Sequence, residues 1–110
     1  MALKHADPGQ VIDLSPYGGN LARKQSIALF KSQDLEVMRL VLLAGKTMPS
    51  HDVAGEITIQ CLEGSVEVAA EGATQVLYPG HLMYLPGRAP HALFALEDAS
   101  VLVTVALRRE

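Results

Sequence analysis

Hydrophobic and polar residues alternate along most of the chain with a period of two. The alternating runs are short and rich in Val, Ile, Leu and Tyr, and glycine, proline or acidic turns separate most of them; they read EITIQCL, SVEVAA, TQVLY, HLMYLP, HALFAL and SVLVTVALR. Such spacing is typical of sandwiches and barrels. No stretch carries a sustained helical period, although residues 20–30 are compatible with either one helical turn or a strand over SIALF. The pattern predicts an all-β protein with a single domain.

Glycine and proline mark the expected turns. Gly64 in LEGSVEV predicts a tight hairpin, because glycine adopts turn conformations that are costly for other residues. Gly72 in EGATQ predicts a second hairpin on the same grounds, and Pro79-Gly80 predicts a further turn.

Two of the expected strands are apolar on both faces. They lie in DLEVMRLVLLAG and SVLVTVAL, whereas a strand with one face in water should alternate cleanly. A second surface must therefore cover the outer face of the sheet. We predict a homodimer; the alternative is that the N-terminal segment, residues 1–25, packs on or swaps across the barrel of residues 26–110.

Composition narrows the classes of function. The chain has 110 residues, a formal net charge of −3 and only scattered basic residues, which argues against a nucleic-acid-binding face. One cysteine allows no disulfide within the chain, no run approaches the roughly 18 apolar residues of a membrane span, and the first residues lack the apolar segment of a signal peptide. We expect a soluble, cytoplasmic protein with no membrane or nucleic-acid partner.

Residues 45–64 hold a histidine between two glycines. Gly45 and KTMPS precede His51, and CLEG ends the stretch at Gly64. This stretch resembles the first motif of the cupin superfamily. Cupins are small antiparallel β-barrels of the jelly-roll type. In that motif Gly, five residues and His are followed by one residue and a second His, then by a Glu and a closing Gly.

The stretch GHLMYLPGRAPHALFA resembles the second cupin motif. Gly80, Pro86 and His91 stand at the positions where that motif has Gly, Pro and His, whereas Arg88 and Ala95 replace its second Gly and its Asn. The two motifs with a hairpin between them are a fairly specific combination. The resemblance implies a single-domain jelly-roll barrel.

The resemblance also implies a metal site. Cupins of the metal-binding kind hold iron, manganese, nickel or zinc through two histidines and a glutamate of the first motif and one histidine of the second. Those positions fall here on His51, Val53, Ile57 and His91. Two of the four are apolar, and Glu56 lies one residue before the position where the glutamate is expected.

Zinc and non-haem iron sites generally use three protein ligands. Glu56 is a candidate third ligand beside His51 and His91, but a one-residue offset in a strand turns the side chain away from the barrel. A bulge at Ala54-Gly55 would turn it back. Asp52 would have to turn in from its loop. The predicted metal site is therefore His51, His91 and Glu56 for one divalent ion (Zn, Fe, Mn or Ni), with a metal-free pocket as the alternative.

Four further residues are candidates for the pocket: Cys61, Tyr84, Phe94 and Arg88. Cys61 shares a face with Ile57 that should look into the barrel, where a lone cysteine usually behaves as a small apolar residue or can serve as a zinc ligand. Tyr84 and Phe94 flank the second motif and either line the pocket or fill the core. Arg88 either binds a carboxylate or phosphate at the pocket rim or is simply solvated.

Three hypotheses about function follow. The first is a barrel that binds a small molecule without catalysis, since half of the metal-ligand set is missing. The second, implied by the resemblance, is a metal-dependent enzyme such as a dioxygenase or isomerase acting on a small organic substrate. The third is a metal-free enzyme with His51 or His91 as general acid–base. The first is our interpretation, the second is the alternative to it, and the identity of the ligand is left open.

Overall fold

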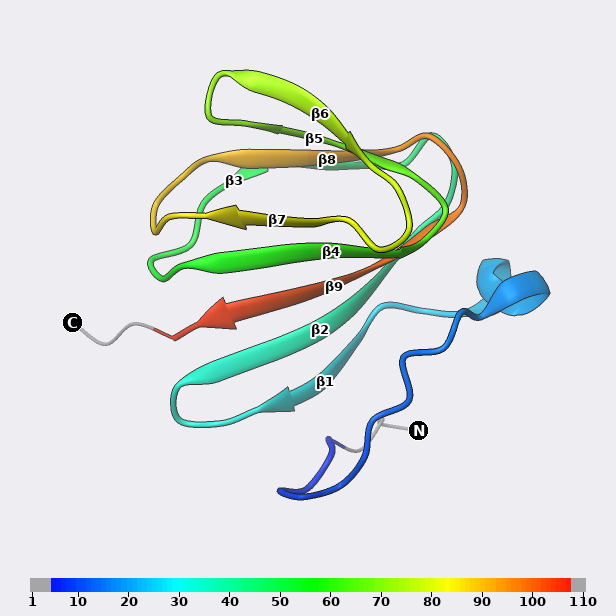
Figure 1. Ribbon diagram of the computed structural model, residues 1–110, viewed down its shortest axis with the longest axis vertical. Helices are drawn as coiled ribbons and strands as arrows, with labels where there is room; N and C mark the ends of the chain where they lie inside the picture. The colour runs from blue at the N-terminus through cyan, green and yellow to red at the C-terminus, as the bar shows by residue number, and fades with distance from the viewer. Residues whose placement is uncertain (1–4, 108–110) are drawn as a thin grey trace.

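Nine β-strands form two antiparallel sheets in the part of the chain that the computed structural model describes, residues 5–107 (Figure 1). In chain order the strands are β1 (Ile27–Lys31), β2 (Leu35–Leu42), β3 (Thr47–His51), β4 (Ile57–Glu63), β5 (Val66–Ala70), β6 (Ala73–Leu77), β7 (Leu82–Leu85), β8 (His91–Ala95) and β9 (Ala99–Ala106). The predicted all-β jelly roll is confirmed, because the period-two runs form strands that leave one face buried.

The two sheets enclose the core between them. The five-stranded sheet has the order β1-β2-β9-β4-β7, and the four-stranded sheet has the order β3-β8-β5-β6. Ile59 pairs with Val103 on the inner face of the first sheet, and Val68 pairs with Leu93 on the inner face of the second. All four side chains are at most 5% exposed. Alternation along each strand therefore turns one face of every sheet toward the interior.

The turns divide into hairpins and connections between the sheets. The hairpin at Gly72 is confirmed: Ala70 pairs with Ala73, and both intervening residues, Glu71 and Gly72, have positive φ (52° and 76°). This geometry is that of a two-residue hairpin turn. The hairpin predicted at Gly64 is wrong, because the turn there leads from β4 in one sheet to β5 in the other and the two strands do not pair.

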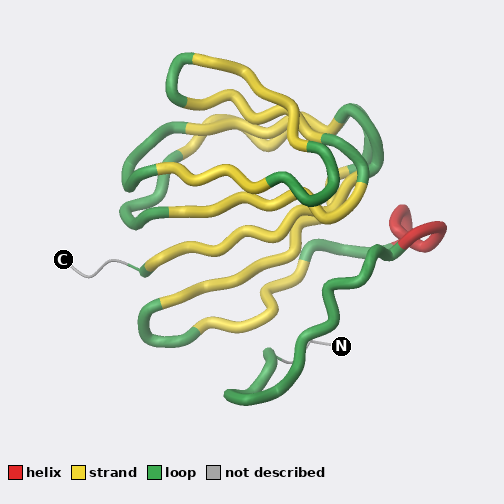
Figure 2. The backbone as a smooth tube through the Cα atoms, viewed as in Figure 1, coloured by secondary structure: helices red, strands yellow, loops and turns green. Residues whose placement is uncertain are grey.

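The segment before β1 runs outside the barrel (Figure 2). It contains a short 3-10 helix, Gly18–Arg23, and the SIALF stretch continues as strand β1. Both readings of residues 20–30 thus hold in part, a turn of helix first and a strand after it. Residues 1–4 of the predicted N-terminal segment and residues 108–110 of the predicted barrel lie outside the described residues. The predicted boundary between segment and barrel, at residue 25, stays a prediction.

An ion pair holds this segment on the outer face of the five-stranded sheet. Arg39 of β2 is 2% exposed and pairs with Glu63 of β4 at 3.0 Å. The Glu63 carboxylate also accepts hydrogen bonds from the backbone N–H groups of Tyr17 and Gly18 (3.0 and 3.1 Å), and the Tyr17 ring covers the Arg39 guanidinium at 3.7 Å. The N-terminal segment therefore covers one part of this outer face.

Within residues 5–107, another part of the outer face is left exposed. Leu82 and Tyr84 of β7 are 61% and 59% exposed and stand beside Gln60 and Thr58 of β4. The predicted homodimer would cover such a surface, and it stays a prediction.

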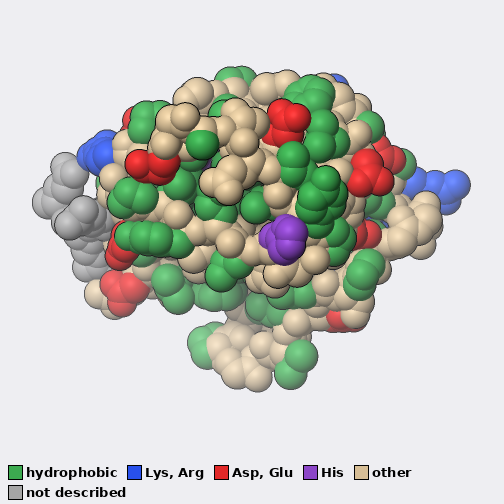
Figure 3. Space-filling model, turned by 45° about the horizontal axis from the view of Figure 1, so that its top comes forward, with side chains coloured by type: hydrophobic (Ala, Val, Ile, Leu, Met, Phe, Trp, Pro, Cys, Tyr) green, Lys and Arg blue, Asp and Glu red, His purple; other side chains and the backbone are tan. Residues whose placement is uncertain are grey.

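Charged side chains are dispersed over one face of the molecule (Figure 3). On the face shown in Figure 3, acidic side chains are scattered among hydrophobic ones and basic side chains appear only at the margin. This face has no continuous basic patch of the kind that binds nucleic acid. Within residues 5–107, no helix has the length and hydrophobicity needed to cross a membrane.

Candidate functional site

The two motif histidines face each other across one pair of strands. His51 at the end of β3 and His91 at the start of β8 are direct partners in the β3–β8 ladder, and their ring centroids lie 4.4 Å apart at 53°. An irregularity in the pairing between Met48 and His51 adjusts the register at this point. Residues forty positions apart in the sequence are thus brought into contact.

The backbone orients both rings in the same way. Nδ1 of His51 lies 3.2 Å from the carbonyl oxygen of Pro49, and Nδ1 of His91 lies 3.0 Å from that of Ala89. A carbonyl oxygen only accepts hydrogen bonds, so each neutral ring carries its proton on Nδ1. Nε2 of each ring is then an electron-pair donor, which is the state in which histidine binds a metal or accepts a hydrogen bond from a ligand.

A cavity of about 170 Å³ opens beside the two rings. It lies between the sheets, and all its other lining side chains are apolar: Met38, Leu40, Met48, Val53, Ile57, Ile59, Leu93, Val103 and Val105. His91 is 2% exposed, whereas His51 is exposed. His91 therefore lies inside the cavity wall and His51 at its opening.

The positions where metal-binding cupins carry further ligands are occupied here by Val53 and Ile57, which line the cavity. Glu56 is exposed and is hydrogen-bonded to Tyr84, whose pKa this bond raises above its ordinary value. β4 begins regularly at Ile57, which pairs with both Leu85 and Val105. Glu56 is therefore not among the residues that the structure brings to the two histidines.

A metal would have two imidazole ligands at this site. In the described part of the chain, no group of three or more His, Cys, Asp or Glu side chains is placed to hold a metal ion. Zinc and non-haem iron sites generally use three protein ligands. The residues present do not fit a tightly held metal, and the predicted ligand set of His51, His91 and Glu56 stays a prediction.

Cys61 belongs to the core. It is fully buried, and its Sγ lies 3.5 Å from the carbonyl oxygens of Glu63 and Gly64. Burial raises the pKa of this thiol, which keeps it protonated and unreactive near neutral pH. Cys61 does not line the cavity described above.

The other predicted pocket residues lie on the outside of the barrel. Tyr84 and Phe94 are 59% and 37% exposed, and neither lines the cavity. Phe94 follows Leu93, which does line it, so strand alternation turns Phe94 to the opposite face. Arg88 lies on the loop between β7 and β8 and is paired with Asp52 across 3.8 Å.

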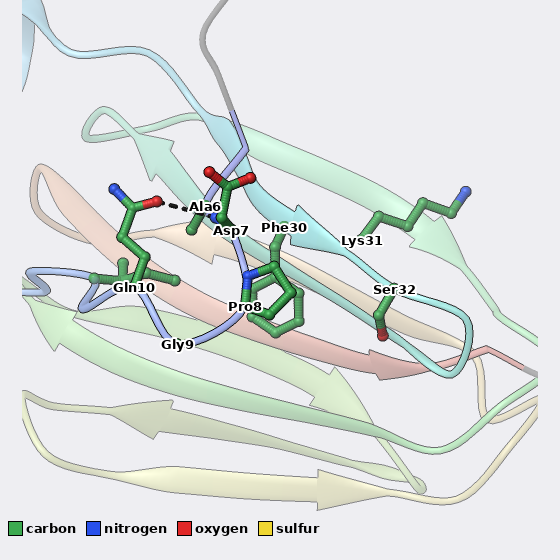
Figure 4. A pocket seen from close by; sticks show the side chains of 9 residues that line it. Ala6, Asp7, Pro8, Gly9, Gln10, Phe30, Lys31 and Ser32 are labelled. Carbon is green, nitrogen blue, oxygen red and sulfur yellow. Dashed lines mark hydrogen bonds between the residues drawn. The ribbon is translucent and has the colours of Figure 1, made fainter.

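A second cavity, of about 420 Å³, lies between the N-terminal segment and β1 (Figure 4). Pro8 and Phe30 meet there, and Gln10 folds back to accept a hydrogen bond from the backbone N–H of Asp7. Among the residues that the structure describes, no histidine or cysteine lines this cavity. We therefore place the candidate site at His51 and His91, although the cavity beside them is smaller.

Sequence reasoning missed most of the apolar lining. Met38 and Leu40 come from strand β2, outside both motifs, and Met48 comes from β3, within the first motif but at none of its characteristic positions. A signal was available in β2, because the charged Arg39 interrupts an apolar run. Arg39 faces outward to Glu63, so strand alternation puts its neighbours Met38 and Leu40 on the inner face.

The structure is similar to solved cupin structures. A conserved protein of unknown function from Streptococcus pyogenes has 22% identity and a TM-score of 0.76, over 100% of this chain and 97% of that one. KdgF from Halomonas sp. has 25% identity and a TM-score of 0.70, over 77% and 79% of the two chains. A cupin superfamily protein from Desulfitobacterium hafniense has 14% identity and a TM-score of 0.74, over 90% and 100%.

Sequence comparison adds no closer assignment, since no protein-family model and no curated protein matches the chain. The likeness therefore rests on the arrangement of strands, which the solved structures share over most of their length. The resemblance predicted from the two motifs is confirmed at the level of the fold: this chain has the jelly-roll fold of the solved cupin structures.

Proposed function

We propose that the chain binds a small molecule in the cavity beside His51 and His91, through the Nε2 atoms of the two rings. The observation that carries the proposal is that both Nδ1 atoms face backbone carbonyl groups. This fixes both rings and leaves two electron-pair donors beside a cavity that is otherwise apolar. Small-molecule sites are commonly apolar concavities with a few oriented polar groups.

The size of the cavity limits the ligand. Its volume of about 170 Å³ is close to that of an apolar protein cavity of about 150 Å³ that admits benzene. We infer that the buried part of the ligand is about as large as one six-membered ring. A hydrogen-bond donor on that ring would meet Nε2 of one histidine.

The proposal can be tested by NMR with ¹⁵N-labelled histidine and a panel of single-ring fragments. We expect fragments to shift the imidazole signals of His51 and His91. His81 is the internal control, because it lies on the turn before β7 and does not line the cavity. His91→Gln should abolish the response and His81→Gln should preserve it. Fragments that shift neither pocket ring, or all rings alike, would contradict the proposal.

The second candidate is the metal-dependent enzyme implied by the cupin resemblance. The convergence of two free Nε2 atoms favours it, and the missing third protein ligand counts against it. Elemental analysis of untagged protein, after incubation with Fe, Zn, Mn or Ni, separates the two candidates. Near-stoichiometric metal in the wild type that is lost in both His51→Ala and His91→Ala would support the enzyme; metal content unaffected by either substitution would exclude this site as its location.

A further inference from the structure

Two methionine side chains share the cavity with the paired histidines. Met38 comes from β2 of the five-stranded sheet and Met48 from β3 of the four-stranded sheet, and both line the cavity together with His51 and His91. The cavity wall thus holds two imidazole rings and two thioether groups, drawn from both sheets. A thioether sulfur is a soft electron-pair donor, and soft donors select soft metal ions such as Cu(I).

Both methionines face the interior without being fully packed. Met38 pairs with Val103 and Met48 with Leu93, and these two partners are 5% and 2% exposed. Directly paired residues share a face of the sheet, so the methionines lie on the inner faces as well. They are half-buried and border the cavity, which places their side chains where an ion in the cavity could meet them.

The lining favours an ion of low charge. Among the described residues, no acidic side chain lines this cavity, so no carboxylate would compensate the charge of a bound cation. The cost of taking an ion out of water rises with the square of its charge, which penalises a divalent ion far more than a monovalent one. The lack of a third nitrogen or oxygen ligand, which counts against zinc and non-haem iron, does not count against Cu(I), because this ion accepts linear and trigonal coordination and binds thioethers.

We propose that Cu(I) binds in this cavity, held by the Nε2 atoms of His51 and His91 and by the thioether sulfurs of Met38 and Met48. Each ring keeps its proton on Nδ1 against a backbone carbonyl oxygen, so no proton has to leave Nε2 before the ion binds. The inference goes beyond the proposed function and does not depend on it, because the ligand is a monovalent ion rather than an organic molecule.

The test is an anaerobic titration of the protein with the coloured complex of Cu(I) and bicinchoninate, from which the protein must withdraw the ion. Met38→Leu and Met48→Leu conserve volume and remove the sulfur, so both variants should fold. Each should bind Cu(I) about tenfold more weakly than the wild type, a loss that even supporting residues of metal sites cause. Met83→Leu is the matched control, since Met83 also packs against the core but does not line the cavity. Cys61→Ala should likewise leave the affinity unchanged.

Ag(I), a stand-in for Cu(I) that is not readily oxidised, gives a readout at each residue through the ¹³C-methyl signals of methionine. We expect the signals of Met38 and Met48 to shift and that of Met83 to stay in place. The inference is overturned if the wild type withdraws no Cu(I) from the dye, if Met83→Leu weakens binding as much as the two lining variants do, or if Zn(II) binds as tightly as Cu(I). The fragment titrations described above use copper-free protein, so either proposal can fail while the other stands.

Discussion

Arg39 and Glu63 form an ion pair beneath the N-terminal segment, with 3.0 Å between Nη2 and Oε2. Ser100 donates to the same carboxylate oxygen at 2.7 Å, and the carbonyl oxygen of Ser15 accepts a hydrogen bond from Arg39 at 2.9 Å. These contacts join strands β2, β4 and β9 to the segment before β1. They link the attachment of that segment to the stability of the barrel.

Glu63→Gln should be strongly destabilising. The substitution leaves the Arg39 guanidinium without its countercharge at a position only 2% exposed, which typically costs about 3 to 5 kcal/mol. Urea unfolding, followed by circular dichroism, measures the loss. Glu67→Gln is a suitable control, because Glu67 is only partly buried and lies outside this ion pair. Equal stability of both variants would show that the ion pair is not important for folding.

The same carboxylate should make stability depend on pH. Desolvation raises the pKa of Glu63, but hydrogen bonds from Ser100, Tyr17, Gly18 and Arg39 outweigh it, so the folded pKa lies below its ordinary value of 4.5. The stabilisation is thus complete above pH 4.5 and is lost as the pH falls through the folded pKa. The stability difference between wild type and Glu63→Gln should shrink below pH 4.5, and a difference that grows with acidification would contradict this assignment.

The histidines should show two different tautomers. Nδ1 of His51 and of His91 faces a carbonyl oxygen, whereas Nδ1 of His81 accepts a hydrogen bond from the backbone N–H of Tyr78 at 3.0 Å. The proton should therefore be on Nδ1 in the first two rings and on Nε2 in the third. Imidazole ¹⁵N chemical shifts, measured where the rings are neutral, distinguish the forms. An Nε2 proton on His91 would remove the structural basis of the proposed function.

Gly87→Ala should disturb the packing of the loop before β8 against the loop before β4. A β-carbon at this position would overlap the carbonyl oxygen of Ala54, so the loops that carry Asp52 and Arg88 would have to move apart. Overpacking of this kind costs about 1 to 3 kcal/mol. Gly19→Ala is the matched control, since a β-carbon there meets no atom within 4 Å. Unfolding curves for both variants, with the His51 signal as a local probe, test this; equal effects would contradict the close contact.

The homodimer can be tested on the exposed part of the outer face. If a second copy covers it, Leu82→Glu should shift the protein to a monomer, because a charge buried against an apolar partner is costly. Light scattering after size exclusion reports the mass. Leu96→Glu, at an exposed apolar residue outside strand β7, is the control. A wild type that is monomeric at high concentration would leave this face exposed and contradict the prediction.

Local sequence signals were sufficient for most strands but not for their pairing. Gly72 and Gly64 carry the same turn signal, and both have positive φ. One lies in a hairpin and the other between sheets, because the turn residue does not determine which neighbour a strand pairs with. That choice depends on which apolar faces meet in the core, and these come from segments far apart in the chain.

The candidate site divides in the same way. The alternation of residues along β4, together with the resemblance of His51 and His91 to motif histidines, was enough to predict an all-β cupin barrel with these two residues near each other. Only the tertiary structure decided that Met38 and Leu40 complete the cavity, that Tyr84 and Phe94 face outward, and that Arg39 is buried against Glu63. Alternation is a local property that follows from strand geometry, whereas contacts between distant strands depend on register and on how two sheets pack.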